Sequence, residues 1–169
     1  MHTYTDGLKP GQVYGYRAPR PDAPHEGPRF NRDQLLLDPY AKDILPPHTQ
    51  SDVPKSRVAD TSFDWQGAKK PQTPWHKTVI YEAHPKGLTK THPAIAADKR
   101  GTYAGVAAPE MIAHYKKLGI TAVELLPVHA HADETHLEKL GKSNYWGYNT
   151  VGFFAPEPSY AQDQKSALT

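Results

Sequence analysis

The chain has 169 residues, a length that suggests one domain or a little more, and it combines 20 basic with 18 acidic residues. The balanced charge and the lack of a basic stripe argue against a nucleic-acid partner, and no apolar run approaches the length of a membrane span. Because there is no cysteine, a disulfide framework and thiolate chemistry are both excluded.

The N-terminal part predicts little regular structure. Residues 11–17 contain Val13, Tyr14 and Tyr16, which favour a short strand. A proline-rich loop follows over residues 18–28. Leu35, Leu36 and Leu37 come just before Asp38-Pro39, a pattern typical of a short apolar anchor and a turn.

A linker is predicted over residues 46–77, which are polar and rich in turn-forming residues. Three large aromatic residues interrupt it, Phe63, Trp65 and Trp75. We expect these side chains to pin the linker onto the region that follows.

The next segment predicts a strand–helix–strand unit. Residues 78–84 and 120–126 are rich in β-branched and aromatic residues, as strands are. Between them, a helix near residues 108–118 is indicated by Pro109 at its start, Gly119 at its end and one apolar face. That face comprises Met111, Ile112, Tyr115 and Leu118. Such units pair their strands in parallel, so an antiparallel pair would contradict the prediction.

Two long connections leave the same ends of the two predicted strands, over residues 85–107 and 127–145. Long loops after strands and tight turns before them are typical of parallel α/β barrels and open sheets, whose sites lie at the carboxyl ends of the strands. The aromatic run of residues 144–156 follows the second loop and suits stacking against flat rings or the apolar faces of sugars. An aromatic cluster that caps the core is the alternative.

Several motifs together resemble bacterial glycogen debranching enzymes, which are isoamylase-type members of the α-amylase superfamily, glycoside hydrolase family 13. They lie at residues 11–17, 29–41, 78–89, 101–105, 118–129 and 144–149, in the order of the family. The resemblance covers roughly residues 8–161. Branching enzymes share the plan but usually lack the Lys-Gly-Leu-Thr phrase of residues 86–89 and the long loop before residue 145.

The resemblance implies an α/β fold in three parts. Residues 1–48 would be the C-terminal remnant of an N-terminal β-sandwich of the glycogen-binding type, residues 49–77 a linker, and residues 78–169 the first two or three strands of a (β/α)8 TIM barrel. A complete barrel takes roughly 250 residues. We therefore expect an incomplete fold, an N-terminal fragment or the product of a truncated reading frame.

No catalytic carboxylate can be assigned, because the family's nucleophile, acid and third carboxylate would all follow Thr169. The resemblance assigns Tyr148 to sugar stacking beside the cleaved bond. Tyr145, Trp146 and Asn149 complete the candidate substrate-binding set, more as support than as contacts. Glu82 and Glu124 are interpreted as structural residues paired inside the barrel or at its ends, and Asp133 and Glu134 as a solvated loop face.

Histidines 84, 129, 131 and 136 do not match a metal-binding pattern, so they are interpreted as loop or hydrogen-bonding residues. Residues 101–105 lack the lysine of a phosphate-binding loop. We expect no cofactor and no metal.

The family function implied is hydrolysis of α-1,6 branch linkages in glycogen or limit dextrin, with an α-glucan as partner and a bacterial cytoplasmic location. Neither a nucleic acid nor a membrane is expected as a partner. Since the catalytic carboxylates are not assigned, the chain alone is expected to be inactive. The alternatives are a non-catalytic α-glucan-binding remnant and a non-functional truncated product.

Overall fold

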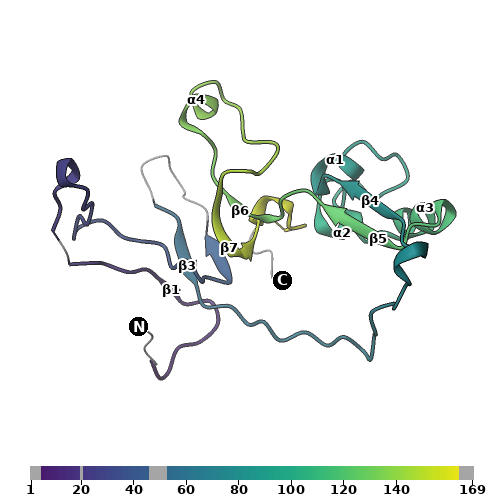
Figure 1. The fold of residues 1–169 in the computed structure, drawn as a ribbon, viewed down its shortest axis with the longest axis horizontal. Coiled ribbons are helices and arrows are strands. Elements are labelled where there is room, and N and C mark those ends of the chain that lie inside the picture. The colour runs from purple at the N-terminus through teal and green to yellow at the C-terminus, as the bar shows by residue number, and fades with distance from the viewer. Residues whose placement is uncertain (1–4, 20, 46–52, 164–169) are drawn as a thin grey trace.

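The computed structural model describes residues 5–19, 21–45 and 53–163. Within them, three small sheets are spread along an elongated chain, with an irregular segment running from the first sheet to the second (Figure 1). The first residues of the predicted linker, 46–52, and the last six residues of the chain lie outside this description.

The first sheet is antiparallel, with the strand order β1-β3-β2. Its strands are β1 (Val13–Tyr14), β2 (Asp43–Leu45) and β3 (Lys55–Arg57). Tyr16 pairs with Leu36 in an isolated bridge, so the predicted strand and apolar anchor lie side by side.

Strand β3 lies inside the segment predicted as a linker, so the irregular connection starts after Arg57. The sequence Lys-Ser-Arg has no apolar alternation, which is why the strand was not predicted. Polar contacts hold it instead: the Ser56 hydroxyl accepts from the Asp38 backbone N–H at 3.0 Å, and Arg57 pairs with Asp43 at 2.6 Å. The division into three domains stays a prediction.

The aromatic residues of this segment are exposed, contrary to the expectation that they pin it down. Phe63, Trp65 and Trp75 are 71%, 70% and 85% exposed. Phe63 and Trp65 meet edge to face, with 4.9 Å between ring centroids. Helix η2 (Trp75–Lys77) then leads into the second sheet.

The predicted strand–helix–strand unit is confirmed. Strands β4 (Ile80–Ala83) and β5 (Ala122–Leu125) are parallel and adjacent, and α3 (Pro109–Leu118) connects them. The helix ends at Gly119, whose φ of 71° is left-handed, a conformation that glycine adopts without strain. An α/β organisation is therefore present, whereas the start of a barrel stays a prediction.

Only part of the predicted apolar face of α3 is covered. Met111 is buried with Ile95 and Ala108, and Tyr115 packs against this cluster. The Tyr115 ring lies 5.8 Å from that of Tyr81 on β4, which places the helix over one face of the sheet. In contrast, Ile112 and Leu118 are 43% and 51% exposed.

The other face of this sheet carries two carboxylates. Glu82 and Glu124 are directly opposite each other in the β4–β5 register, and both are exposed. The interpretation of these residues as paired structural acids is therefore wrong for the described part of the chain, since neither carboxylate forms an ion pair there. They are neighbours of like charge.

The two long connections are more structured than predicted. The first contains α1 (Pro85–Thr89) and α2 (Tyr103–Val106), and the second contains β6 (His129–His131) and α4 (Thr135–Glu138). Strand β6 pairs antiparallel with β7 (Thr150–Pro156), which is followed by η3 (Pro158–Tyr160). A further short helix, η1, spans Pro24–Glu26. The third sheet is thus a hairpin whose strands are separated by a long excursion.

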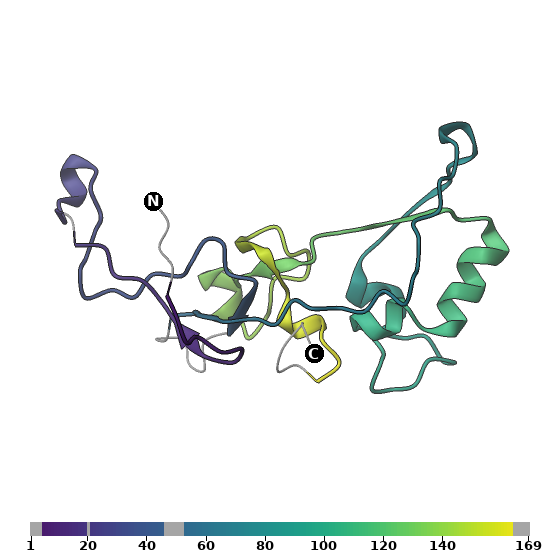
Figure 2. The same cartoon turned by 90° about the horizontal axis from the view of Figure 1, so that it is seen from below.

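A small apolar cluster joins the hairpin to the first sheet. Ile44 of β2 is buried with Ala41, with Ala130 of β6 and with Ala155 of β7. Both views place this hairpin between the first sheet and the β4–β5 unit (Figures 1 and 2). No helix in the described ranges is long and apolar enough to cross a membrane.

Candidate functional site

The aromatic loop of residues 144–149 leaves the excursion of the hairpin just before β7, and Asn144 anchors its start. The Asn144 backbone N–H donates to Asp133 Oδ1 at 2.6 Å, and its side-chain amide donates to Glu134 Oε1 at 3.0 Å. Its Oδ1 in turn accepts from the Gly147 N–H at 2.9 Å. Asp133 and Glu134 therefore hold the loop. Asp133 is exposed, as expected of a solvated face, whereas Glu134 is half-buried, so that interpretation is wrong for Glu134.

Gly147 makes the turn of this loop possible. Its φ is 78°, and a Cβ there would lie 3.3 Å from both His131 Nδ1 and the Pro127 Cβ. A side chain at this position would be strained and crowded at once. Glycine therefore suits this position on both grounds, its positive φ and the close approach of its neighbours.

The four sequence-predicted site residues fall into two groups. Tyr148 is 70% exposed, and Trp146 is 56% exposed with its ring edge-on to Tyr145 at 5.3 Å. Tyr145 is 45% exposed and stacks on His84, with 4.1 Å between the ring centroids and 8° between the planes. Asn149 exchanges backbone and side-chain hydrogen bonds with Ala132. Tyr148 and Trp146 thus face outward, while Tyr145 and Asn149 fasten the loop.

A buried network lies beneath the loop, at the junction of β6 and η3. Glu157 Oε2 accepts from the His131 backbone N–H at 3.1 Å and lies 3.2 Å from His131 Nδ1. Glu157 Oε1 accepts from the Ser159 N–H at 2.9 Å. Because a backbone N–H can only donate, both carboxylate oxygens of Glu157 act as acceptors in this arrangement.

Two tyrosines complete the floor of this region. The hydroxyl of Tyr103 lies 3.2 Å from the carbonyl oxygens of both Val128 and Glu157. The Tyr160 ring is 5.8 Å from those of His84 and Tyr103. Burial raises the pKa of Tyr160 to about 12, and it raises the pKa of Tyr103 as well, since the phenolate would lose its hydration.

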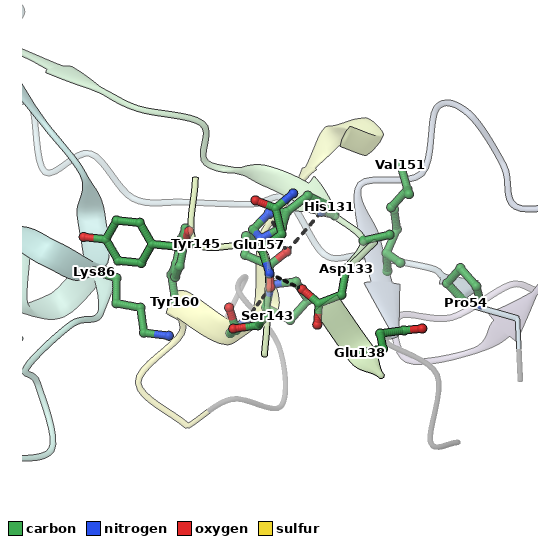
Figure 3. A pocket seen from close by; sticks show the side chains of 16 residues that line it. Pro54, Lys86, His131, Asp133, Glu138, Ser143, Tyr145, Val151, Glu157 and Tyr160 are labelled. Carbon is green, nitrogen blue, oxygen red and sulfur yellow. Dashed lines mark hydrogen bonds and ion pairs between the residues drawn. The ribbon is translucent and has the colours of Figure 1, made fainter. Parts of the chain in front are cut away.

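A cavity of about 390 Å³ opens beside this network, between β2 and the hairpin. Figure 3 shows Lys86 and Tyr145 towards one end and Pro54 and Val151 towards the other. The polar side chains that line it are Lys86, His131, Asp133, Glu138, Ser143, Asn144, Glu157 and Ser159. The cavity meets the loop at Asn144 and Tyr145, whereas Tyr148 is not part of its lining.

Potential metal ligands do not gather in the described ranges. No group of three or more His, Cys, Asp or Glu side chains there could hold a metal ion. Segment 101–105 forms the start of α2, and its Thr102 hydroxyl caps that short helix by accepting from the Gly105 N–H.

Sequence reasoning missed His84, His131, Glu157 and Tyr160 as members of this region. The only sequence signal for His84 was its place before Pro85, since a proline in the first helical turn marks the preceding residue as a cap. The β6–β7 pairing brings together His131, Glu157 and Tyr160, and no local sequence pattern predicted this pairing. The expectation that the histidines form hydrogen bonds is confirmed for His84 and His131.

Among solved structures, the chain is similar to part of several bacterial pullulanases. A pullulanase type I from Bacillus subtilis complexed with maltose matches with a TM-score of 0.57 and 28% identity, over 77% of this chain and 19% of that one. A pullulanase from Paenibacillus barengoltzii in complex with maltohexaose and α-cyclodextrin matches with a TM-score of 0.60 and 28% identity, over 78% and 22%. No protein-family profile matches the chain.

Curated relatives of this chain are named as glycogen debranching enzymes. Glycogen debranching enzymes of Yersinia enterocolitica and Yersinia pseudotuberculosis are 49% and 48% identical to this chain over 97% of its length. The chain spans 27% of the length of these relatives. The resemblance to glycogen debranching enzymes of the α-amylase superfamily is therefore confirmed along nearly the whole chain.

Proposed function

We propose that this chain carries an α-glucan-binding loop of a debranching glycoside hydrolase, with Tyr148 as its sugar-stacking residue. The observation that carries the proposal is the loop of residues 144–149, which is fastened by Asn144, Tyr145 and Asn149 and leaves Tyr148 70% exposed. An aromatic ring on a backbone that is already held offers an apolar face to sugar C–H groups, and little entropy is lost in ordering the loop. The maltooligosaccharide complexes of the similar pullulanases favour the same class of ligand.

Binding is measured by titrating maltohexaose into the chain while following the fluorescence of Trp146. The other two tryptophans, Trp65 and Trp75, are exposed and are replaced by phenylalanine to isolate the signal. We expect Tyr148→Ala to weaken binding by about fivefold or more, the order of one lost aromatic contact.

Tyr40→Ala is the matched control. Tyr40 is also strongly exposed, at 71%, but it precedes β2 and stacks on Phe154 of β7 instead of belonging to the loop. Glu134 is unsuitable as a control since it holds Asn144. Equal losses in the two tyrosine variants would argue against the proposal.

Hydrolysis of α-1,6 linkages is proposed for the family's complete machinery and not for this chain alone. Glycoside hydrolysis needs two carboxyl groups across the scissile bond, and the resemblance assigns neither of them to a residue of this sequence. We therefore expect no release of reducing ends from glycogen or limit dextrin above a protein-free blank. If reducing ends are released equally by the purified chain and by all of its variants, a contaminating enzyme is the source. If Glu82→Gln or Glu124→Gln abolishes the release, the proposal is overturned. The cytoplasmic location stays a prediction.

A further inference from the structure

The imidazole of His84 sits between two segments that are distant in sequence. It directly follows β4, and its Nδ1 accepts hydrogen bonds from the backbone N–H groups of Lys86 and Gly87, both at 3.1 Å. Its Nε2 lies 2.6 Å from the carbonyl oxygen of Tyr145. One ring therefore caps helix α1 and reaches the aromatic loop.

These three contacts define the hydrogen positions on the ring. A backbone N–H can only donate, so Nδ1 must present its lone pair, and a carbonyl oxygen can only accept, so Nε2 must carry the hydrogen. The neutral imidazole protonated at Nε2 is the one state that satisfies all three contacts. A second proton, on Nδ1, would face two donors.

The contact with Tyr145 is reinforced by packing. The Tyr145 ring stacks on the imidazole, and its hydroxyl lies against Gly87, where any Cβ would collide with it. His84 is also 8% exposed, so water competes little for the bond to the Tyr145 carbonyl. The loop is thereby fixed to the end of β4 three residues before Tyr148.

We propose that His84 is a positioning residue for α-glucan binding: its Nε2–H holds the Tyr145 backbone and so orients the exposed ring of Tyr148. This inference rests on the proposed function of the loop. The remaining anchors, at Asn144 and Asn149, tie the loop to its own excursion, including Ala132 just after β6, whereas His84 ties it to the end of β4 in the parallel sheet.

Two substitutions separate the capping role of His84 from the positioning role. In His84→Asn, the short amide supplies an acceptor for the first turn of α1, as asparagine does at helix starts, but its donor cannot reach Tyr145. In His84→Gln, the longer amide places a donor near the position of Nε2 and gives up the cap. A merely structural role predicts that asparagine is the better replacement in every assay.

The experiment uses the whole chain with Trp146 as its single tryptophan, and it measures maltohexaose affinity, thermal midpoint and acrylamide quenching of Trp146. For His84→Asn we expect a thermal midpoint close to that of the unsubstituted chain, an affinity about three- to tenfold weaker and increased quenching, the order of one lost buried hydrogen bond. For His84→Gln we expect a lower midpoint and an affinity nearer to that of the unsubstituted chain.

Imidazole ¹⁵N chemical shifts give a direct reading of the ring, with His84 expected to show a protonated Nε2 and a lone pair on Nδ1. A protonated Nδ1, or unchanged affinity and quenching in His84→Asn, overturns the proposal. If the unsubstituted chain fails to bind maltohexaose, or if Tyr148→Ala binds it as tightly as the unsubstituted chain, the proposed function fails. The quenching and the ¹⁵N shifts still decide whether His84 holds the loop in that case.

Discussion

The β4–α3–β5 unit and the β6–β7 hairpin meet beside the aromatic loop, yet they are stabilised in different ways. In the first, a buried methionine and a contact between the tilted rings of Tyr81 and Tyr115 hold a helix against two parallel strands. In the second, the excursion of residues 132–149 separates the two strands of the hairpin. Side chain–backbone hydrogen bonds hold this excursion. Apolar burial therefore builds the scaffold, and directional polar contacts shape the loop.

The largest effect is expected from Met111→Ala in the β4–α3–β5 unit. Met111 is 3% exposed, and truncating a buried methionine leaves a cavity that costs about 2–5 kcal/mol. Urea denaturation followed by circular dichroism measures the change. Ile112→Ala is the control, since this neighbour is 43% exposed and its truncation should cost far less. Similar losses in both variants would mean that α3 is not packed as described.

Glu157→Gln tests the polar network of the hairpin and should have the next largest effect. The two carboxylate oxygens now accept from the N–H groups of His131 and Ser159. In glutamine, the NH2 group replaces one oxygen and faces one of these donors. A buried N–H is then left without an acceptor, at a cost of about 1–3 kcal/mol. The same urea assay measures it. Glu138→Gln changes an exposed acid at the same cavity and should be nearly neutral. A neutral Glu157→Gln would show that Glu157 is not needed as a carboxylate.

Asn144→Ala should loosen the loop with a smaller effect on global stability. The variant loses the bonds to Glu134 and to the Gly147 N–H, worth about 1 kcal/mol each at most. Hydrogen exchange at the Gly147 amide should become faster, while exchange in β4 and β5 stays unchanged. Faster exchange throughout the molecule would contradict the separation between scaffold and loop.

The smallest expected effect is a pH dependence from Tyr160. Its pKa is raised to about 12 from the ordinary value near 10, so the folded state keeps its proton where the unfolded chain loses it. The stability that this adds is fully present below pH 10 and is lost as the pH rises towards 12. In Tyr160→Phe, the urea midpoint should fall less steeply over that interval. An unchanged slope would mean that the phenol is well hydrated.

The same contrast explains what the sequence could predict. The period of the apolar residues and the stop at Gly119 predicted the parallel pair and its helix, because burial leaves a regular pattern in the chain. Strand β3 and the hairpin were missed because Lys55-Ser-Arg57 is polar and because β6 and β7 pair across a long excursion. At the site, the aromatic run of residues 144–156 pointed to the loop, whereas the role of Tyr148 came from the family resemblance and stays a prediction. His84 and Glu157 were missed, because a hydrogen bond to a distant backbone group leaves no local pattern.

The two neighbouring glutamates of the parallel pair have a consequence for the conditions under which the chain is studied. Glu82 and Glu124 are in register on the exposed face, and side-by-side like charges weaken strand pairing. Dissolved ions screen exposed charges over a distance of about 8 Å at physiological ionic strength. The β4–β5 pair, and the edge from which His84 reaches the loop, should therefore gain stability as salt is added, so a dilute buffer is the harsher solvent for this molecule.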